Sequence, residues 1–334
     1  MIPRLDIRFP LKRQWKYWFG AAYMAQEGEY LLNHARTGIV MALRAALPKG
    51  GRVGVVAYNC HTVANAVVIA GCEPFFVDVT EDLRIDVASV PVDLDAIVVT
   101  NLFGIQNDVE AIRKRLPKAI IIVDNAHGYG LPVEGDFTVY SINQGKFPAL
   151  GEGGILYAID DFRFKIDDLY KTLPGYGIIA QVKLFVQMMV KAIAYSRCMY
   201  WLTMKMKKSA NPNVHQLVVM KQMAPGVRRL YQAWLPNADN EITAQRANAK
   251  QICNIQSKIS NSQYMIGSNA FMAIVKCDNP EELKKEFVNR GVETETHFKH
   301  CIEWAEEFGY KRGTCPNAEE LVDHLLMIPT YREI

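Results

Sequence analysis

Short runs of apolar and β-branched residues recur through the first half of the chain, with helical patterns between most of them. Six runs have the length and composition of buried strands: 52–58, 75–79, 96–100, 120–123, 137–141 and 155–158. Strands that alternate with helices in this way form a mostly parallel sheet covered on both faces. The pattern therefore predicts an open α/β fold, in which ligands bind at the carboxyl ends of the strands.

Two reactive side chains follow neighbouring runs of this pattern. Asp124 comes directly after the run 120–123, and Lys146 follows the run 137–141. We expect both side chains at the same edge of the sheet, in one crevice. A pyridoxal phosphate enzyme needs an amine that forms a Schiff base with the aldehyde and a carboxylate that keeps the pyridine nitrogen protonated. From the pattern alone, a solvated lysine and a helix-capping aspartate are the alternatives.

The residues around this pair resemble a known family signature. The relevant strings are Asp124-Asn125-Ala126-His127-Gly128, Tyr140-Ser141-Ile142-Asn143-Gln144-Gly145-Lys146 and Gly151-Glu152-Gly153-Gly154. They resemble the Asp-x-Ala-Gln, Phe-Ser-Phe-x-x-x-Lys and Gly-Glu-Gly-Gly motifs of the DegT/DnrJ/StrS family of pyridoxal-phosphate-dependent sugar aminotransferases. The similarity covers most of the chain from Asn33 onward and is weakest between Asp160 and Ala224.

The resemblance implies a fold, a cofactor and an assembly. The fold is the PLP-transferase fold of type I, a mostly parallel central sheet with helices on both faces, plus a small α+β C-terminal domain. We divide the chain into a large PLP-binding domain (1–168), a basic helical connecting segment (169–240) and the small domain (241–334). The implied cofactor is pyridoxal 5'-phosphate, and the implied assembly is a homodimer.

The resemblance also implies individual roles. Lys146 is the catalytic amine and Asp124 its partner at the ring nitrogen, and the presence of Lys146 argues against the dehydratase branch, which carries His there. The implied cofactor-binding residues are Thr37, Gly38, Cys60, His61, Asp124, His127, Ser141 and Lys146, and the implied substrate-binding residues are His297 and Arg229. Without the resemblance, Thr37 is an ordinary helix cap, Cys60 a small buried side chain and His297 a structural histidine.

Three positions depart from the family pattern. His127 stands where relatives carry Gln against the phenolic oxygen, and Glu295 replaces an Arg. Pro225 stands near the position where relatives carry an Asn that reaches the phosphate of the neighbouring subunit. Arg228 or Arg229 is the candidate to replace that Asn as a phosphate partner. These departures motivate a second hypothesis, a catalytically idle relative that serves as a binding or regulatory protein.

The segment 169–238 is free of acidic residues. It contains ten basic ones: Lys171, Lys183, Lys191, Arg197, Lys205, Lys207, Lys208, Lys221, Arg228 and Arg229. Its apolar part, 178–206, is too charged to span a bilayer. Three interpretations compete: contact with an anionic membrane surface, a positive rim for a nucleotide diphosphate, and a helical arm that packs on the dimer partner. We favour the last two together, and peripheral membrane contact is the interpretation we favour less.

Charge and cysteine content exclude several classes of protein. The chain has 334 residues and a formal net charge of +3, without a basic cluster interleaved with aromatics, which argues against a nucleic-acid binder. Seven cysteines form no C-x-x-C pair, so a zinc site is unsupported. The odd count of cysteines and the N-terminal sequence, which lacks a signal peptide's apolar core, favour the cytoplasm.

The expected reaction follows from the resemblance. An amino group from glutamate is transferred to a keto-sugar attached to a nucleotide, in surface polysaccharide or antibiotic sugar synthesis. A third hypothesis keeps pyridoxal phosphate but uses a carbonyl acceptor that is not a sugar.

Overall fold

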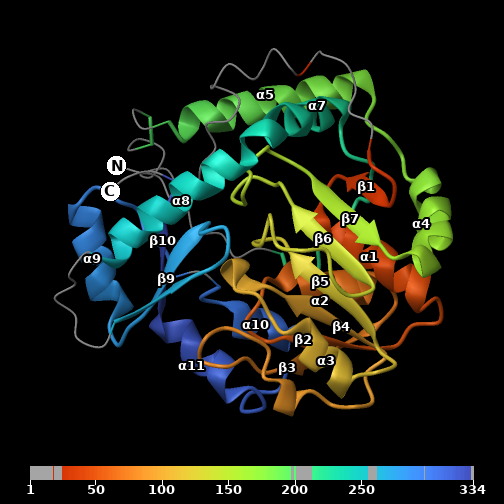
Figure 1. Ribbon diagram of the computed structural model, residues 1–334, viewed down its shortest axis with the longest axis horizontal. Helices are drawn as coiled ribbons and strands as arrows, with labels where there is room; N and C mark the ends of the chain where they lie inside the picture. Colours follow the sequence, from red (N-terminus) through yellow and green to blue (C-terminus); the bar gives the residue numbers. More distant parts are fainter. Residues whose placement is uncertain are drawn as a thin grey trace.

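The computed structural model describes Trp18 and residues 25–196, 199–200, 213–254, 262–296 and 298–331. Within these residues, a seven-stranded sheet has the order β1-β7-β6-β5-β4-β2-β3 (Figure 1). Its strands are β1 (Glu29–Leu32), β2 (Arg52–Val56), β3 (Glu73–Val77), β4 (Ala96–Thr100), β5 (Ile120–Asn125), β6 (Phe137–Ser141) and β7 (Gly154–Ala158). Strands β3, β2, β4, β5 and β6 are parallel, and β7 runs antiparallel to β6 and β1. This confirms the expected mostly parallel α/β fold.

Helices cover both faces of this sheet because its central strands are apolar on both sides. The helices up to the second sheet are α1 (Ala35–Ala46), α2 (His61–Ile69), α3 (Val109–Arg115), α4 (Asp160–Thr172), α5 (Ile178–Ala194), α7 (Pro225–Trp234) and α8 (Ala238–Cys253), with short 3₁₀ turns at Val87–Ser89, Leu102–Gly104 and Leu235–Asn237. In β5, Ile122 packs in the core shared with α1, α2 and α4, whereas Ile121 and Val123 pack in the core shared with α3 and α7. Alternate residues of one strand thus serve two cores.

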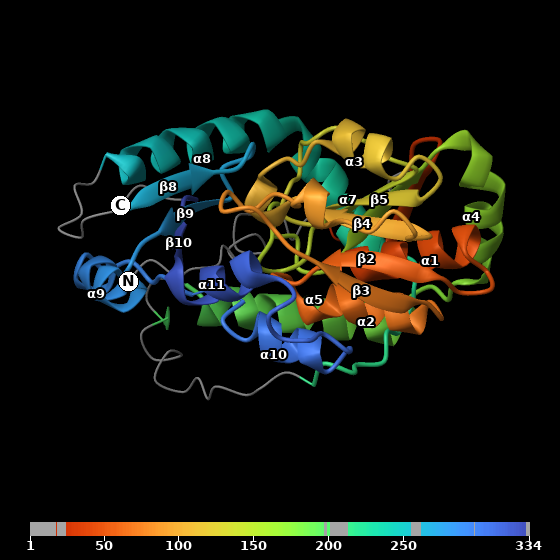
Figure 2. The same cartoon turned by 90° about the horizontal axis from the view of Figure 1, so that it is seen from below.

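A second, three-stranded antiparallel sheet follows, in the order β10-β9-β8. Its strands and the helices beside them are β8 (Gln263–Ile266), β9 (Met272–Lys276), α9 (Pro280–Asn289), α10 (Cys301–Glu306), α11 (Pro316–His324) and β10 (Leu325–Pro329). Both views place this sheet at one end of the molecule and the seven-stranded sheet at the other (Figures 1 and 2). The positions after 168 and after 240, where we divided the chain, lie within α4 and α8.

The two sheets are linked through the N-terminus of α11. Asp78, which follows β3 and is 4% exposed, accepts the backbone N–H groups of Asn317 at 3.1 Å and Ala318 at 2.9 Å. Since the first N–H groups of a helix have no partner inside it, this carboxylate caps α11 from the other part of the chain.

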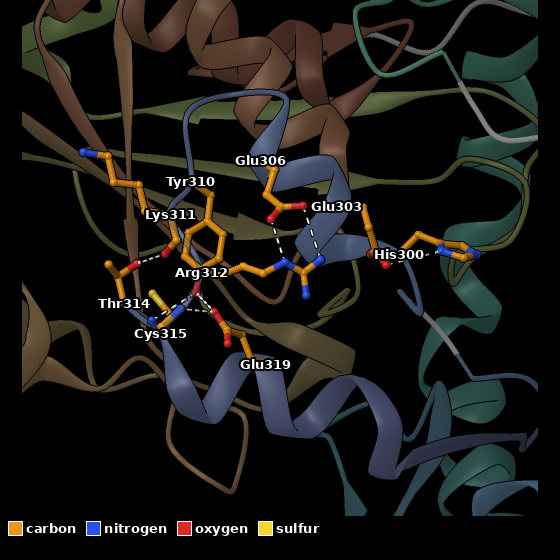
Figure 3. A network of polar contacts seen from close by, with 10 residues as sticks. His300, Glu303, Glu306, Tyr310, Lys311, Arg312, Thr314, Cys315 and Glu319 are labelled. Atoms are coloured by element: carbon orange, nitrogen blue, oxygen red, sulfur yellow. Dashed lines mark hydrogen bonds and ion pairs between the residues drawn. The ribbon is translucent and has the colours of Figure 1, made fainter.

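The turn before α11 is held by a polar network (Figure 3). The Tyr310 hydroxyl donates to Glu319 at 2.5 Å and accepts the backbone N–H of Cys315 at 3.0 Å. Glu319 also accepts the N–H of Gly313 at 2.6 Å, while the Arg312 guanidinium contacts Glu306 at 2.7 Å. This network fixes where α11 begins. Across the described ranges, no helix is long and apolar enough to cross a membrane.

Candidate active site

A cavity of about 220 Å³ opens at the carboxyl ends of β4, β5 and β6. It is lined by residues that follow successive strands and by Phe298 from the C-terminal part of the chain; among them are Arg36, Cys60, Thr100, Asp124, His127, Ser141, Asn143 and Lys146. The structure therefore brings Asp124 and Lys146 together in one crevice, as we expected from their positions after neighbouring strands.

Asp124 is a buried carboxyl group at the end of β5, 3% exposed. It accepts the backbone N–H of Ala126 at 3.0 Å and the Thr100 hydroxyl at 3.5 Å. Burial raises its pKa, while the two hydrogen bonds, and Lys146 when its amine is protonated, act in the opposite direction. Because burial destabilises a charged carboxylate, a cation beside Asp124 would stabilise it. A protonated ring nitrogen is a cation of the required size.

Lys146 is half-buried, and the burial around its amine lowers the pKa of the amine, opposed by the nearby groups of Cys60 and Asp124. The Nε2 atom of His127 lies 2.5 Å from Nζ of Lys146. The Nδ1 atom of the same imidazole accepts the backbone N–H of Phe103 at 3.2 Å. A neutral imidazole that accepts at Nδ1 carries its proton on Nε2, so His127 donates to the lysine. The acceptor must then be the unprotonated amine, which is the nucleophilic form.

Phe103 holds His127 in this orientation, and sequence reasoning missed it. Its backbone has φ +53°, the left-handed conformation, in the turn after β4. Asn107 donates its backbone N–H to the Asn101 side chain at 2.8 Å and so braces the turn. The Phe103 ring stacks on His127 with centroids 5.3 Å apart and an angle of 12° between the ring planes. The string Asn101-Leu102-Phe103-Gly104 after a strand was the available signal for a turn with special backbone geometry.

The first turn of α1 lies two residues earlier than we expected. The helix begins at Ala35 with His34 as its N-cap, so Thr37 and Gly38 are internal. Thr37 is fully buried and donates its hydroxyl to Asn33 at 2.8 Å rather than lining the cavity. A Cβ on Gly38 would lie 2.9 Å from Cγ1 of Val139, so glycine lets the helix approach the sheet. His34, Ala35 and Arg36 line the cavity in their place.

This end of the cavity can hold an anion. Arg36 lines it and forms no hydrogen bond or ion pair with the residues that the structure describes. Ser141 lines it too, and its hydroxyl oxygen accepts the N–H of Asn143 at 3.4 Å. Burial, together with the charge of Arg36, lowers the pKa of His34 to about 4. An arginine, a serine hydroxyl and the start of a helix are groups that bind phosphate.

Several expected site residues lie elsewhere. Cys60 lines the cavity and accepts the Thr62 hydroxyl at 3.1 Å, but the neighbouring His61 packs its ring edge-on against Trp304, with centroids 4.9 Å apart. The Arg229 guanidinium donates to the backbone oxygen of Trp18 at 2.6 Å, away from the cavity. His297 lies outside the described residues, and the adjacent Phe298 lines the cavity with a φ of +59°.

Other departures from the family pattern have structural partners of their own. Arg228 donates to the Tyr170 hydroxyl at 3.0 Å and to Gln222 at 3.3 Å, so it does not reach the cavity. The backbone N–H of Glu295 donates to Met327 at 3.2 Å in an antiparallel bridge. Pro225 begins α7. Arg228, Glu295 and Pro225 do not line the cavity. Among the described residues that do line it, the arginine is Arg36.

Solved structures of known proteins share this fold. CalS13, a sugar aminotransferase from Micromonospora echinospora, superposes with a TM-score of 0.72 at 16% identity, covering 99% of this chain and 95% of CalS13. DesV from S. venezuelae gives a TM-score of 0.72 at 17% identity, covering 98% of this chain and 93% of DesV. Spr1654 from Streptococcus pneumoniae, in its PMP form, gives a TM-score of 0.71 at 14% identity, covering 95% of this chain and 91% of Spr1654. These likenesses confirm the PLP-transferase fold of type I.

Sequence comparison identifies the family. One relative, the uncharacterized protein MJ1066 of Methanocaldococcus jannaschii, is 24% identical over 330 residues, covering 92% of this chain and 82% of that protein. The model of the DegT/DnrJ/EryC1/StrS aminotransferase family matches residues 21–334. This match covers nearly the whole chain, including the cavity and both sheets, and the protein therefore belongs to the DegT/DnrJ/EryC1/StrS aminotransferase family.

Proposed function

We propose that this protein is a pyridoxal-phosphate-dependent aminotransferase that moves an amino group from glutamate to a nucleotide-linked keto-sugar. The observation that carries the proposal is the placement of Lys146 and Asp124 in one cavity, with an anion-binding end beside them. The family is pyridoxal-phosphate-dependent, and solved structures that share this fold include sugar aminotransferases.

The cavity residues fit pyridoxal phosphate. A protonated ring nitrogen would give the buried carboxylate of Asp124 a charge partner, and Arg36 with Ser141 offers partners to a phosphate. When bound, pyridoxal phosphate supplies an aldehyde for amines and a cationic ring that stabilises negative charge on the carbon beside the nitrogen. Cys60, the N-cap residue of α2, lines the same cavity, which supports a role for it in covering one face of the ring.

Each protein group then has a defined task. Lys146, held as a free amine by burial and by the His127 N–H, is the nucleophile and afterwards the base and acid that moves the substrate proton. Asp124 keeps the proton on the ring nitrogen. His127, which donates through Nε2, would offer this N–H to the phenolic oxygen of the bound cofactor.

The donor, the acceptor and the assembly belong to the proposal as well. Glutamate supplies the nitrogen, a nucleotide-linked keto-sugar accepts it, and the enzyme works as a homodimer. We also propose a cytoplasmic location, supported by the cysteines that the structure describes, all of which are free thiols: Cys60, Cys72, Cys253, Cys277, Cys301 and Cys315.

Absorbance spectroscopy tests the proposal. The purified protein with added pyridoxal phosphate is expected to absorb in the visible range and to bleach with glutamate, whereas Lys146→Ala is expected to lose the covalent link, seen as an unchanged protein mass after borohydride reduction. A wild-type protein that stays colourless would instead support the idle relative. A bleached enzyme that aminates no nucleotide-linked keto-sugar in a panel would support an acceptor of another class.

A further inference from the structure

The outer face of α5 is apolar although it faces solvent. Six of its side chains are exposed to between 48% and 85%: Ile178, Ile179, Val182, Val186, Val190 and Ile193. Leu184, Met188 and Ala192 are buried on the opposite face. The helix runs along the outer edge of the molecule next to α7 (Figure 1). An exposed aliphatic row of this length on one helix marks an interaction surface.

The charges beside this row are all positive. Lys183 and Lys191 are exposed on α5 between the aliphatic residues. The acid-free segment 169–238 carries ten of the 38 basic residues, so the rest of the chain has 28 basic and 35 acidic residues, a net charge of −7. Positive charge is therefore concentrated in the part of the chain that exposes the aliphatic row.

The inner face of α5 fixes the helix to the body of the protein. A Cβ on Gly151 would lie 2.4 Å from Cε of Met188, so α5 packs directly on the glycine loop that follows Lys146. Phe185 packs on Trp18 with ring centroids 5.2 Å apart. Glu152, in the same glycine loop, accepts a hydrogen bond from the Tyr176 hydroxyl. The outer face is thus presented by a helix that is itself well anchored.

We propose that the outer face of α5 binds in the plane of an anionic lipid bilayer, with the aliphatic row among the acyl chains and the lysines at the headgroups. A helix with aliphatic and basic residues and no acidic ones fits this surface. At 1.5 Å per residue, its 17 residues span about 25 Å along the membrane. The inference is independent of the reaction, because no cavity residue takes part in it.

Charge and surface chemistry argue against two other contacts. A two-fold contact of α5 with α5 of a second copy would place Lys183 and Lys191 of each copy against a surface of the same sign. Nucleic acid would use the lysines but not six exposed aliphatic side chains, since its outer surface is phosphate. An anionic bilayer uses both kinds of residue.

Vesicle co-sedimentation tests the proposal with the full-length, cofactor-loaded protein. We expect it to sediment with vesicles of equal parts phosphatidylcholine and phosphatidylglycerol, to bind much less to phosphatidylcholine alone, and to be partly released by added salt. Lys183→Glu/Lys191→Glu should weaken binding about tenfold or more, because each lysine near the surface contributes on the order of 1 kcal/mol. Val186→Asp/Val190→Asp should abolish it.

A matched control keeps the result specific. Lys118→Glu/Lys250→Glu changes the net charge equally at two exposed lysines away from α5, and Phe164→Asp alters an exposed apolar residue of α4. These variants should bind like the wild type. The proposal fails if the wild type stays in the supernatant with anionic vesicles, or if the α5 variants bind as well as the controls. A wild-type dimer that the α5 variants dissociate, without vesicle binding, would assign the face to a second copy instead.

Discussion

The imidazole of His127 joins the turn after β4 to the reactive lysine: its Nδ1 accepts the N–H of Phe103, and its Nε2 lies 2.5 Å from Nζ of Lys146. A backbone amide keeps its proton at every pH of interest, so it fixes which imidazole nitrogen carries hydrogen. The consequence is that Lys146 accepts the hydrogen bond from His127. The protein thereby favours the neutral amine by two means, burial and a donor.

The first prediction concerns this donor. Replacing His127 with Phe removes the N–H that stabilises the neutral amine, so the pKa of Lys146 should rise toward its ordinary value. The rate at which pyridoxal phosphate couples to the lysine should then need a higher pH to reach its plateau. His127→Gln keeps an N–H donor and should shift the pH profile less. Equal profiles for the three proteins would contradict the assigned tautomer.

A second prediction concerns the cofactor-free protein. Burial raises the pKa of Asp124, so the folded state holds its proton more tightly than the unfolded state, and the contribution of Asp124 to stability is lost as the pH rises through its folded pKa. Asp124→Asn removes the buried charge and should make the cofactor-free protein more stable at neutral pH, by about 1.4 kcal/mol for each unit of the shift. The same variant should bind the cofactor but lose its activity.

Urea unfolding of both cofactor-free proteins at acidic and neutral pH measures this effect. The gain should shrink at acidic pH, where the wild-type carboxyl is already protonated in the folded protein. Thr100→Val is a useful comparison, because it removes a hydrogen bond to Asp124 and leaves the carboxyl in place. A variant that is less stable than the wild type at neutral pH would contradict the prediction.

The strands of the site were predictable from sequence because their signals are local. β5 and β6 are continuous apolar runs, and the rule that ligands bind at the carboxyl ends of parallel strands placed Asp124 and Lys146 together. The start of α1 was harder. The Thr37-Gly38 pair looked like a helix start, but Thr37 turns its hydroxyl inward to Asn33 and the helix begins at Ala35.

Contacts between segments far apart in the sequence could not be predicted. The His127–Phe103 hydrogen bond depends on a positive φ in a turn, which periodicity does not report. His61 stands beside Cys60 in sequence, yet its ring packs on Trp304 because it belongs to the first turn of α2 and faces the C-terminal part of the chain. For the segment that contains α5, the sequence left a membrane surface, a positive rim and a dimer contact open, because an apolar run without acidic residues does not show which of its faces is buried.

A third prediction concerns acid stability. Burial lowers the pKa of His34 to about 4, below its ordinary value of 6.5. The unfolded state therefore binds more protons between these values, and the stability that neutral His34 provides is lost as the pH falls through this window. The full effect is about 3 kcal/mol. His34→Asn should flatten the pH dependence of urea unfolding in this window, and an unchanged pH dependence in this variant would contradict the prediction.

A fourth prediction concerns the link between the two sheets. Asp78→Ala removes the cap of α11 and should lower stability by about 1–2 kcal/mol. Hydrogen exchange should quicken at the first turn of α11 while the strands of the large sheet stay protected. Asp108→Ala removes the cap of α3 within the large part of the chain and serves as the control. Faster exchange in α11 for the control would show that the effect is not specific to Asp78.

The fifth prediction identifies the phosphate partner. Arg36 lines the cavity beside Ser141 and has no ion-pair partner among the described residues, so a bound phosphate would take its charge. Arg36→Gln should weaken binding of pyridoxal phosphate about tenfold or more, in line with roughly 1.5–3 kcal/mol for a charged hydrogen bond. Binding of pyridoxal, which lacks the phosphate, should hardly change. Arg44→Gln, on the exposed last turn of the same helix, should affect neither ligand. Equal losses for both ligands in Arg36→Gln would mean that Arg36 supports the cavity and does not bind the phosphate.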